Sequence, residues 1–202
     1  IEILKKRKKL KAFINSSSSS VYGNPTTFPT PENERIDPLS PYALQKYTSE
    51  YYIRILCDYF KIPAISLRYF NPYGERSFNE KNPQNAYSSV IGIFLYNKMN
   101  GIPLKIFGTG QQSRDFIHVS DVVGANICVA NKIKETHHKV FNVGIGKKVK
   151  IIEIARFLSD SFTFEKARPG EADVTWAETK RLTEIGWKAK ADVFDYLRKE
   201  LL

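Results

Sequence analysis

Short apolar runs rich in β-forming residues alternate with longer segments of helical periodicity along this 202-residue chain. The short runs predict strands at residues 11–16, 63–69, 104–107, 116–119 and 139–143. Helical spacing predicts helices at residues 42–60, 86–99, 120–133, 149–162, 178–185 and 191–201. This alternation favours an α/β fold with a mainly parallel sheet. A loop as long as residues 17–40 is usually functional in a compact domain.

The net charge of +10 raises the question of a nucleic-acid partner. The densest basic run, residues 5–11, lies where a predicted helix at residues 1–10 ends, and cations suit that end of the helix dipole. The other basic residues are scattered and no nucleic-acid-binding motif is present, so we exclude nucleic acid. An anionic nucleotide diphosphate would suit a basic site. No apolar run approaches the roughly 20 residues that cross a bilayer, so we expect no membrane partner.

Cysteine and histidine usage gives no sign of a disulfide framework or a metal centre. Cys57 and Cys128 both fall in predicted helices among apolar neighbours, which favours two buried free thiols in a reducing compartment. We therefore expect a cytoplasmic protein. The pair at residues 137–138 is surrounded by no pattern of Cys or carboxylate residues, and we predict no metal site there.

Residues 40–46 (SPYALQK) are the segment richest in chemical information. Ser40 is a typical N-cap and Pro41 is typical of a first helical turn, so a helix is predicted to begin here. Tyr42 and Lys46 would then lie one turn apart on the same face. An ammonium group near a phenol stabilises the phenolate, which makes the tyrosine a candidate proton-transfer group. A tyrosine–lysine pair at this spacing also occurs by chance in many helices.

Four other segments accompany this pair in a fixed order: AFINSSSSSVYG at 12–23, LRYFNPYG at 67–74, QSRDFIHV at 112–119 and RPGE at 168–171. Together they resemble the extended short-chain dehydrogenase/reductase family. Within it the chain is most similar to the NAD-dependent epimerase/dehydratase group of the UDP-glucose and UDP-N-acetylglucosamine 4-epimerase kind. The resemblance extends from about residue 11 to the C-terminus.

The resemblance implies the C-terminal part of a Rossmann-type parallel sheet plus a small α/β substrate-binding domain. Residues 1–80 would carry the catalytic residues, and 81–202 mainly the sugar-nucleotide domain, with strands and helices that return to the sheet. The family begins with a glycine-rich turn that binds NAD, and no G-x-x-G-x-x-G occurs here. By this comparison roughly the first hundred residues of a typical member are absent. We expect a fragment, a split gene product or a truncated form that is unstable and inactive alone.

The resemblance assigns the catalytic roles to three residues. Tyr42 would be the acid/base, and Lys46 its electrostatic partner, which also bonds the nicotinamide ribose. Ser18 would bond the reacting sugar hydroxyl, although Ser17 or Ser19 could point inward instead, or Ser18 could simply cap backbone groups. A phenolate near the sugar 4-hydroxyl can take its proton while hydride leaves C4 for NAD.

Five further residues are assigned by resemblance to the nicotinamide and the sugar nucleotide. Tyr69 and Phe70 would flank the nicotinamide, although strand aromatics also pack in cores and at least one of these two rings is expected to do so. Asn71 would bond the sugar nucleotide. Ala86 and Tyr87 would contact the diphosphate at the start of a helix.

The remaining assigned residues would bind the nucleotide. Lys105 and Phe107 lie on the predicted strand that would hold the uracil. Arg114 and Arg168 resemble the pair that neutralises the diphosphate, a role that suits the forked guanidinium. The alternative for each is a surface ion pair. Glu171 aligns with the acid that bonds the uridine ribose hydroxyls.

The reaction type can be argued from two serines. Related dehydratases and decarboxylases carry carboxylates where this chain has Ser19 and Ser20, so 4-epimerisation is favoured. The substrates would be UDP-glucose and UDP-galactose or their N-acetyl or uronic forms, and residues 85–90 (NAYSSV) favour the latter two slightly. The alternatives are another nucleotide-sugar dehydratase or reductase, or an inactive remnant that only binds. Relatives usually dimerise through the catalytic helix, here residues 42–60, so a homodimer is expected.

Overall fold

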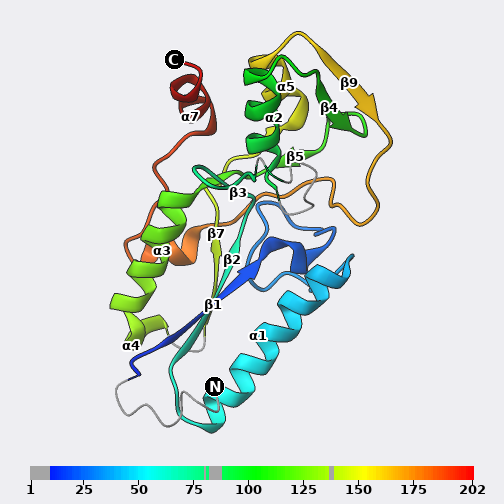
Figure 1. Ribbon diagram of the computed structural model, residues 1–202. Coiled ribbons are helices and arrows are strands. Elements are labelled where there is room, and N and C mark those ends of the chain that lie inside the picture. Colours follow the sequence, from blue (N-terminus) through cyan, green and yellow to red (C-terminus); the bar gives the residue numbers. More distant parts are fainter. Residues whose placement is uncertain (1–9, 80, 82–87, 137–138) are drawn as a thin grey trace.

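The computed structural model describes residues 10–79, 81, 88–136 and 139–202, and it is an α/β structure (Figure 1). Its central sheet has three parallel strands in the order β1-β2-β7, namely β1 Phe13–Ser18, β2 Ala64–Tyr69 and β7 Lys139–Val143. In the register of these strands Ser18 lies opposite Tyr69, and Tyr69 opposite Val143. The carboxyl ends of all three strands therefore lie at the same edge, where ligands bind in open parallel sheets.

Two helices cover opposite faces of this sheet, α1 Pro41–Tyr59 and α3 Val119–Asn131 (Figure 1). The alternation of side chains along β2 explains why the faces differ. Ile65 and Leu67 pack into an apolar cluster that includes Ala125 and Val129 of α3. Ser66 and Arg68 instead point to the α1 face, where they make polar contacts. The α1 face is therefore polar at its centre and the α3 face apolar.

A second region packs around its own apolar core beside the carboxyl edge of the sheet (Figure 1). Its helices are α2 Val90–Met99, α5 Ile151–Leu158 and α7 Val193–Glu200. Its strands form two small pairs: β4 Leu104–Phe107 parallel to β9 Phe162–Glu165, and β5 Ser113–Arg114 antiparallel to β8 Val149–Lys150. The other short elements are β3 Pro72–Tyr73, β6 Ile117–His118, α4 Ile133–Thr136, α6 Lys180–Glu184 and the 3-10 helix η2 Ser19–Tyr22.

The start of α1 is as the sequence predicts. The Ser40 side chain accepts a hydrogen bond from the backbone N–H of Ala43 at 3.2 Å, and Pro41 occupies the first turn. Both features satisfy or remove N–H groups that have no partner within the helix. The helix that carries Tyr42 is therefore fixed at its beginning by local sequence.

The predicted helix at residues 149–162 is wrong at both ends. It spans only Ile151–Leu158, and Phe162 begins strand β9 instead. Glu153 accepts a hydrogen bond from the backbone N–H of Lys150, which sets the start. Phe162 and Phe164 alternate along β9 in register with Leu104 and Ile106 of β4, so pairing with a distant strand overrides the local pattern.

The expectation of two buried thiols is only half right, because Cys57 is buried and Cys128 half-buried, and both are free. The predicted helix from residue 86 is described only from Val90, and its first residues lie outside the described part of the chain. Within the described residues, every helix is too short or too polar to cross a membrane.

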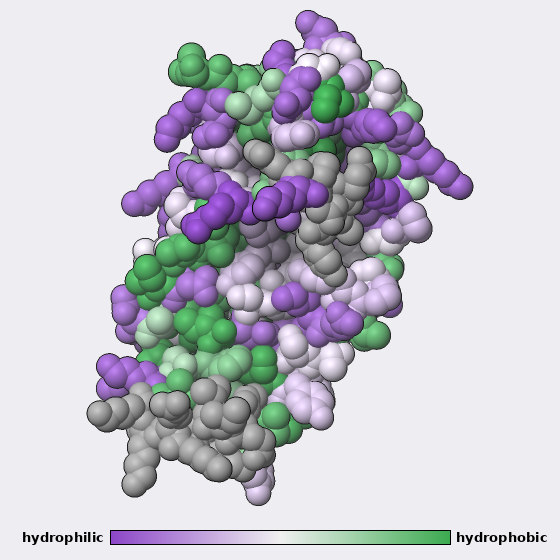
Figure 2. Space-filling model, in the orientation of Figure 1, coloured by the Kyte–Doolittle hydropathy of each residue, from purple (hydrophilic) through white to green (hydrophobic). Residues whose placement is uncertain are grey.

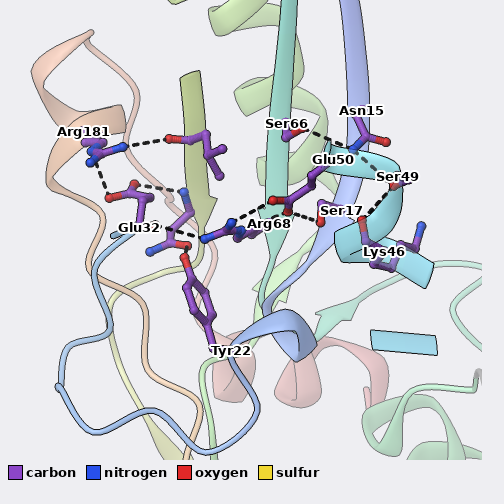
Figure 3. A network of polar contacts seen from close by, with 12 residues as sticks. Asn15, Ser17, Tyr22, Glu32, Lys46, Ser49, Glu50, Ser66, Arg68 and Arg181 are labelled. Atoms are coloured by element: carbon purple, nitrogen blue, oxygen red, sulfur yellow. Dashed lines mark hydrogen bonds and ion pairs between the residues drawn. The ribbon is translucent and has the colours of Figure 1, made fainter. Parts of the chain in front are cut away.

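A buried ion pair joins α1 to the sheet. Arg68 of β2 donates to both carboxylate oxygens of Glu50, with Nε–Oε1 2.9 Å and Nη2–Oε2 2.7 Å (Figure 3). Its Nη1 donates to the backbone oxygen of Glu32 at 3.1 Å, and its guanidinium lies 4.7 Å from the centre of the Tyr22 ring. Burial disfavours the charged guanidinium, but the bonds and charge of Glu50 outweigh burial, so the pKa of Arg68 is raised.

The same network reaches the other edge of the sheet. The Tyr22 hydroxyl donates to Asn142 of β7 at 2.6 Å, and the backbone N–H of Asn142 donates to Glu32 at 3.0 Å. Glu32 also pairs with Arg181 at 3.3 Å (Figure 3). The loop before α1 is therefore held against β2 and β7 by charged and polar contacts in the interior.

We predict that Arg68→Ala lowers the free energy of unfolding by about 3–5 kcal/mol, because Glu50 would stay buried without its cation. The matched control is Arg35→Ala, which removes the exposed partner of Asp37 and should cost less than about 1 kcal/mol. Urea unfolding followed by tryptophan fluorescence measures both values. Equal losses in the two variants would contradict the prediction.

Candidate active site

A cleft of about 440 Å³ opens at the carboxyl edge of the sheet, between the sheet and the second region. It is lined by eight residues that the sequence predicts for the site: Ser18, Tyr69, Asn71, Lys105, Phe107, Arg114, Arg168 and Glu171. They come from β1, β2, β4, β5 and the loops that follow β2 and β9. Residues far apart in the chain thus meet around one cavity large enough for a small molecule.

Tyr42 and Lys46 lie on one face of the first turns of α1. The Lys46 Nζ is 5.7 Å from the centre of the Tyr42 ring and donates to the backbone oxygen of Ser16 at 2.9 Å. Both side chains line a separate hollow of about 460 Å³ together with Asn15, Gln45 and Ser49. Hydroxyl, ammonium and amide groups therefore gather beside the end of β1, and this donor set fits the hydroxyls of a nicotinamide ribose.

Ser18 ends β1 and caps η2. Its Oγ accepts a hydrogen bond from the backbone N–H of Ser20 at 3.2 Å and one from the Ser20 hydroxyl at 2.9 Å. It thus makes the local capping contacts that the sequence allows and also lines the cleft, as do Ser19 and Ser20. Ser17 points to the opposite face, where its hydroxyl donates to Glu50. Of the alternatives to Ser18, only Ser19 faces the cleft.

The two aromatic residues that end β2 have different surroundings. The Tyr69 hydroxyl lies 3.1 Å from the Ser16 hydroxyl and accepts from Asn126 at 3.0 Å, and its ring lines the cleft. Phe70 is only 1% exposed and packs with Val21, so it does not face the cleft. The expectation that at least one ring packs in the core therefore applies to Phe70, and we do not retain Phe70 as a cofactor contact.

Asn71 connects the end of β2 to the far side of the cleft. Its φ is 38°, a left-handed conformation that asparagine tolerates better than most residues. Its amide nitrogen donates to the backbone oxygen of Asp115 at 2.9 Å and to the Thr175 hydroxyl at 2.8 Å. Both amide hydrogens of Asn71 are thus used within the protein, where they join the walls of the cleft. The role assigned to Asn71 from the sequence, a contact to the substrate, did not include this structural role.

Asp115 is a buried residue that the sequence reasoning missed, although it lies within the motif at 112–119. Its carboxylate accepts from the backbone N–H groups of Ile145 at 2.8 Å, Gly146 at 3.0 Å and Ala177 at 3.0 Å. Burial raises its pKa to about 6, and these hydrogen bonds oppose the rise. Asp115 therefore joins the segment that follows β7, at Ile145 and Gly146, to the segment around Ala177.

One part of the cleft wall, called here the arginine end, carries two guanidinium groups around one carboxylate. Arg114 lies 3.3 Å and Arg168 3.9 Å from Glu171, and the Arg168 guanidinium lies 3.8 Å from the centre of the Phe107 ring. The side chain of Arg114 is 11% exposed, and burial lowers its pKa, but a guanidinium stays protonated in proteins. The carboxylate of Glu171 is therefore the anion that pairs with both guanidiniums, and the Arg168 guanidinium lies over the Phe107 ring.

The structure adds cleft residues that had no assigned role. The Gln112 amide donates to the backbone oxygen of Phe107 at 2.6 Å, and Ser89 both caps α2 and lines the cleft. Ala86 and Tyr87, predicted to contact the diphosphate, lie outside the described residues, as does the pair at 137–138.

Comparison with known proteins identifies the family of the chain. The family described as the NAD dependent epimerase/dehydratase family matches residues 1–144. A putative UDP-glucose 4-epimerase from Methanocaldococcus jannaschii is 33% identical to the chain, over 98% of the chain and 64% of that protein.

Two solved structures also match closely. The UDP-N-acetylglucosamine 4-epimerase from Methanobrevibacter ruminantium, in complex with UDP-N-acetylmuramic acid, has a TM-score of 0.85 at 33% identity, over 98% of this chain and 63% of that one. The UDP-glucuronic acid 4-epimerase from Bacillus cereus, in complex with UDP-glucuronic acid and NAD, has a TM-score of 0.86 at 29% identity, over 98% and 62%.

The chain thus spans less than two thirds of the length of each of these relatives. The family match nevertheless covers well over half of the chain, and the fold agrees with the Rossmann-type structures at high similarity. The chain belongs to the NAD dependent epimerase/dehydratase family.

Proposed function

We propose that the chain supplies the catalytic residues and the sugar-nucleotide site of an NAD-dependent UDP-sugar 4-epimerase. The observation that carries this proposal is the cleft itself. Hydroxyl groups of Ser18 to Ser20 line it where β1 ends, beside the start of α1, which carries Tyr42, and Arg114 and Arg168 line it from β5 and from the loop after β9. A sugar at the serine end and a diphosphate at the arginine end would match this distribution of polar groups.

In the proposed reaction, bound NAD supplies the acceptor and later the donor of a hydride at C4 of the sugar. Tyr42 would take the proton of the C4 hydroxyl, and the Lys46 ammonium lies one helical turn away, 5.7 Å from the centre of its ring. Ser18 orients the same hydroxyl and stabilises the oxygen as charge develops on it. The 4-keto sugar would then turn in the cleft, and Tyr42 would return the proton to the C4 oxygen.

The nucleotide would occupy the arginine end. Arg114 and Arg168 would bind the diphosphate with forked hydrogen bonds, and Glu171 would turn from these arginines toward the ribose hydroxyls. Phe107 and Lys105 would hold the uracil, in keeping with the position of both on β4 at the cleft wall.

Epimerisation is favoured over elimination because the described part of the cleft offers no unpaired carboxylate. Glu171 is the only acidic side chain among the described residues that line it, and it pairs with Arg114 and Arg168. Removal of a proton from C5, which dehydration requires, needs a base near the sugar, and the serine end offers only hydroxyls there. Residues 85–90 still favour N-acetyl or uronic sugars slightly.

We further propose that activity requires a glycine-rich NAD-binding segment, because the printed sequence contains none. Strand β1 ends the sheet order, and nothing among the described residues pairs with its outer edge. Apolar surface also gathers over α3, where Val119, Val123 and Ile127 are exposed at four-residue spacing (Figure 2). An open edge and an uncovered apolar face suit packing against such a segment. Residues 1–80 would then form the NAD-binding half together with that segment, and residues 81–202 would form mainly the sugar-nucleotide half.

The function is tested by fusing to the 202 residues the part of the Methanocaldococcus jannaschii relative that the match leaves uncovered. With NAD, the fusion should interconvert the C4 epimers of UDP-glucose or of its N-acetyl or uronic forms, as followed by NMR. The 202 residues alone should show no turnover. A 4-keto-6-deoxy product would instead indicate a dehydratase, and no turnover of any of these sugars would contradict the proposal.

In the active fusion, Tyr42→Phe should lower kcat by about 10²- to 10⁴-fold, because the group that moves the C4 proton is lost. Tyr59→Phe is the matched control, since Tyr59 lies on the same helix, is 77% exposed and should keep kcat within about twofold. A Tyr42→Phe variant as fast as the control would remove Tyr42 from the mechanism.

We predict that Arg114→Leu raises KM for the UDP-sugar about tenfold or more while kcat falls much less, because a diphosphate contact is made in ground and transition state alike. The control is Arg198→Leu, which removes an exposed ion pair with Asp195. Arg198 does not line the cleft, so both constants should stay unchanged. Steady-state kinetics of the fusion measures them. Loss of kcat at unchanged KM would argue against a binding role.

A homodimer through α1 is part of the proposal. The outer face of this helix exposes Leu44 at 55%, Tyr52 at 65% and Ile55 at 50%, an apolar surface that a second copy could cover. Light scattering should give the mass of a dimer, and Ile55→Glu should give a monomer. A parent protein that is already monomeric at micromolar concentration would contradict this.

A further inference from the structure

Three consecutive residues of β1 each bond the catalytic helix, and Figure 3 draws the contacts of Asn15 and Ser17. The Asn15 amide donates to the Ser49 hydroxyl at 3.5 Å, the Lys46 Nζ donates to the backbone oxygen of Ser16 at 2.9 Å, and the Ser17 hydroxyl donates to Glu50. The next residue of the strand, Ser18, faces the cleft. The helix that carries Tyr42 is thus tied to the strand immediately before the residue proposed to hold the sugar hydroxyl.

The Ser17 contact is the most firmly anchored of the three. Glu50 lies two turns after Tyr42 and one turn after Lys46 along α1, and it is buried at 6% exposure. Its carboxylate is held by two hydrogen bonds from Arg68, which itself contacts the backbone of Glu32. Because Glu50 cannot shift without breaking a buried ion pair, the Ser17 hydroxyl joins β1 to a fixed point on the helix.

We propose that Ser17 is a positioning residue for the epimerase reaction: through Glu50 it sets where Tyr42 stands relative to Ser18. This inference rests on the proposed function. The reacting hydroxyl must lie within hydrogen-bond reach of both Tyr42 and Ser18, and a displacement of about 1 Å can cost up to about 10²-fold in rate. Ser17 itself does not line the cleft, so it acts only through the helix.

The same polar interior offers a matched control. Ser66 of β2 is buried like Ser17, with exposed fractions of 7% and 3%, and its hydroxyl accepts one hydrogen bond, from Asn15 at 3.2 Å. Ser66→Ala therefore removes a buried hydroxyl between two strands, whereas Ser17→Ala removes one between strand and helix. A purely structural role for Ser17 would make the two variants alike.

The experiment compares Ser17→Ala, Ser66→Ala and the parent in the active fusion. Ser17→Ala should lower kcat about tenfold while KM for the UDP-sugar changes less than about twofold, because the arginine end of the cleft is untouched. Ser66→Ala should leave both constants within about twofold of the parent, at a similar melting temperature. Equal kcat values in the two variants would overturn the inference.

A rescue variant tests whether the hydroxyl itself matters. Ser17→Thr keeps the hydroxyl and suits a strand, so its kcat should stay within about threefold of the parent. A Ser17→Thr variant as slow as Ser17→Ala would contradict the inference. The comparison of Ser17→Thr with the parent can be made even if Ser17→Ala folds poorly.

Hydrogen exchange separates failure of this inference from failure of the proposed function. Amide exchange in residues 41–50, measured by mass spectrometry, should rise in Ser17→Ala and stay at the parent level in Ser66→Ala. If the parent shows no epimerase activity, the proposed function fails while this measurement still tests the contact. If the parent is active and neither exchange nor kcat responds to Ser17→Ala, the inference alone fails.

Discussion

The ion pair between Arg68 and Glu50 holds together the parts of this molecule that form the site. It is buried, bidentate and joined to the loop before α1 through the backbone of Glu32. Buried ion pairs gain little net stability over apolar residues, because desolvation offsets the attraction between the charges. What they do enforce is geometry, since neither charge can remain buried alone. The pair thereby fixes a helix, a strand and a long loop in one arrangement.

The chemistry of the cleft follows from this arrangement. The three strands of the central sheet end level with one another, so Ser18 and the residues after Tyr69 meet at one edge. Asn71 and Asp115 then fasten the second region to that edge through hydrogen bonds to backbone and hydroxyl groups. The cleft consequently carries hydroxyl groups from Ser18 to Ser20 on one part of its wall and the guanidinium groups of Arg114 and Arg168 on another.

Local sequence was sufficient for the elements whose signals are local. The cap at Ser40, the strands at 104–107 and 139–143 and the spacing of Tyr42 and Lys46 all follow from neighbours in the chain. Strand β9 did not follow, because residues 162–165 are paired by a strand about sixty positions away in the sequence. Asp115 was missed, and Phe70 was assigned to the cofactor, because the burial of each depends on remote segments: Asp115 bonds Ile145 after β7, and Phe70 packs with Val21 and Ala177.

The sequence by itself determined the fold class and the residue types of the site, since periodicity, capping and motif order are properties of neighbouring residues. Tertiary structure alone decided that Ser18 lines the cleft and Ser17 does not, because successive side chains of a strand point to opposite faces: Ser18 to the cavity and Ser17 to Glu50. It also decided that Arg114, Arg168 and Glu171 form one charged cluster, since their approach requires the loop after β9 to lie beside β5. Distances between remote residues are set by packing, which no local pattern encodes.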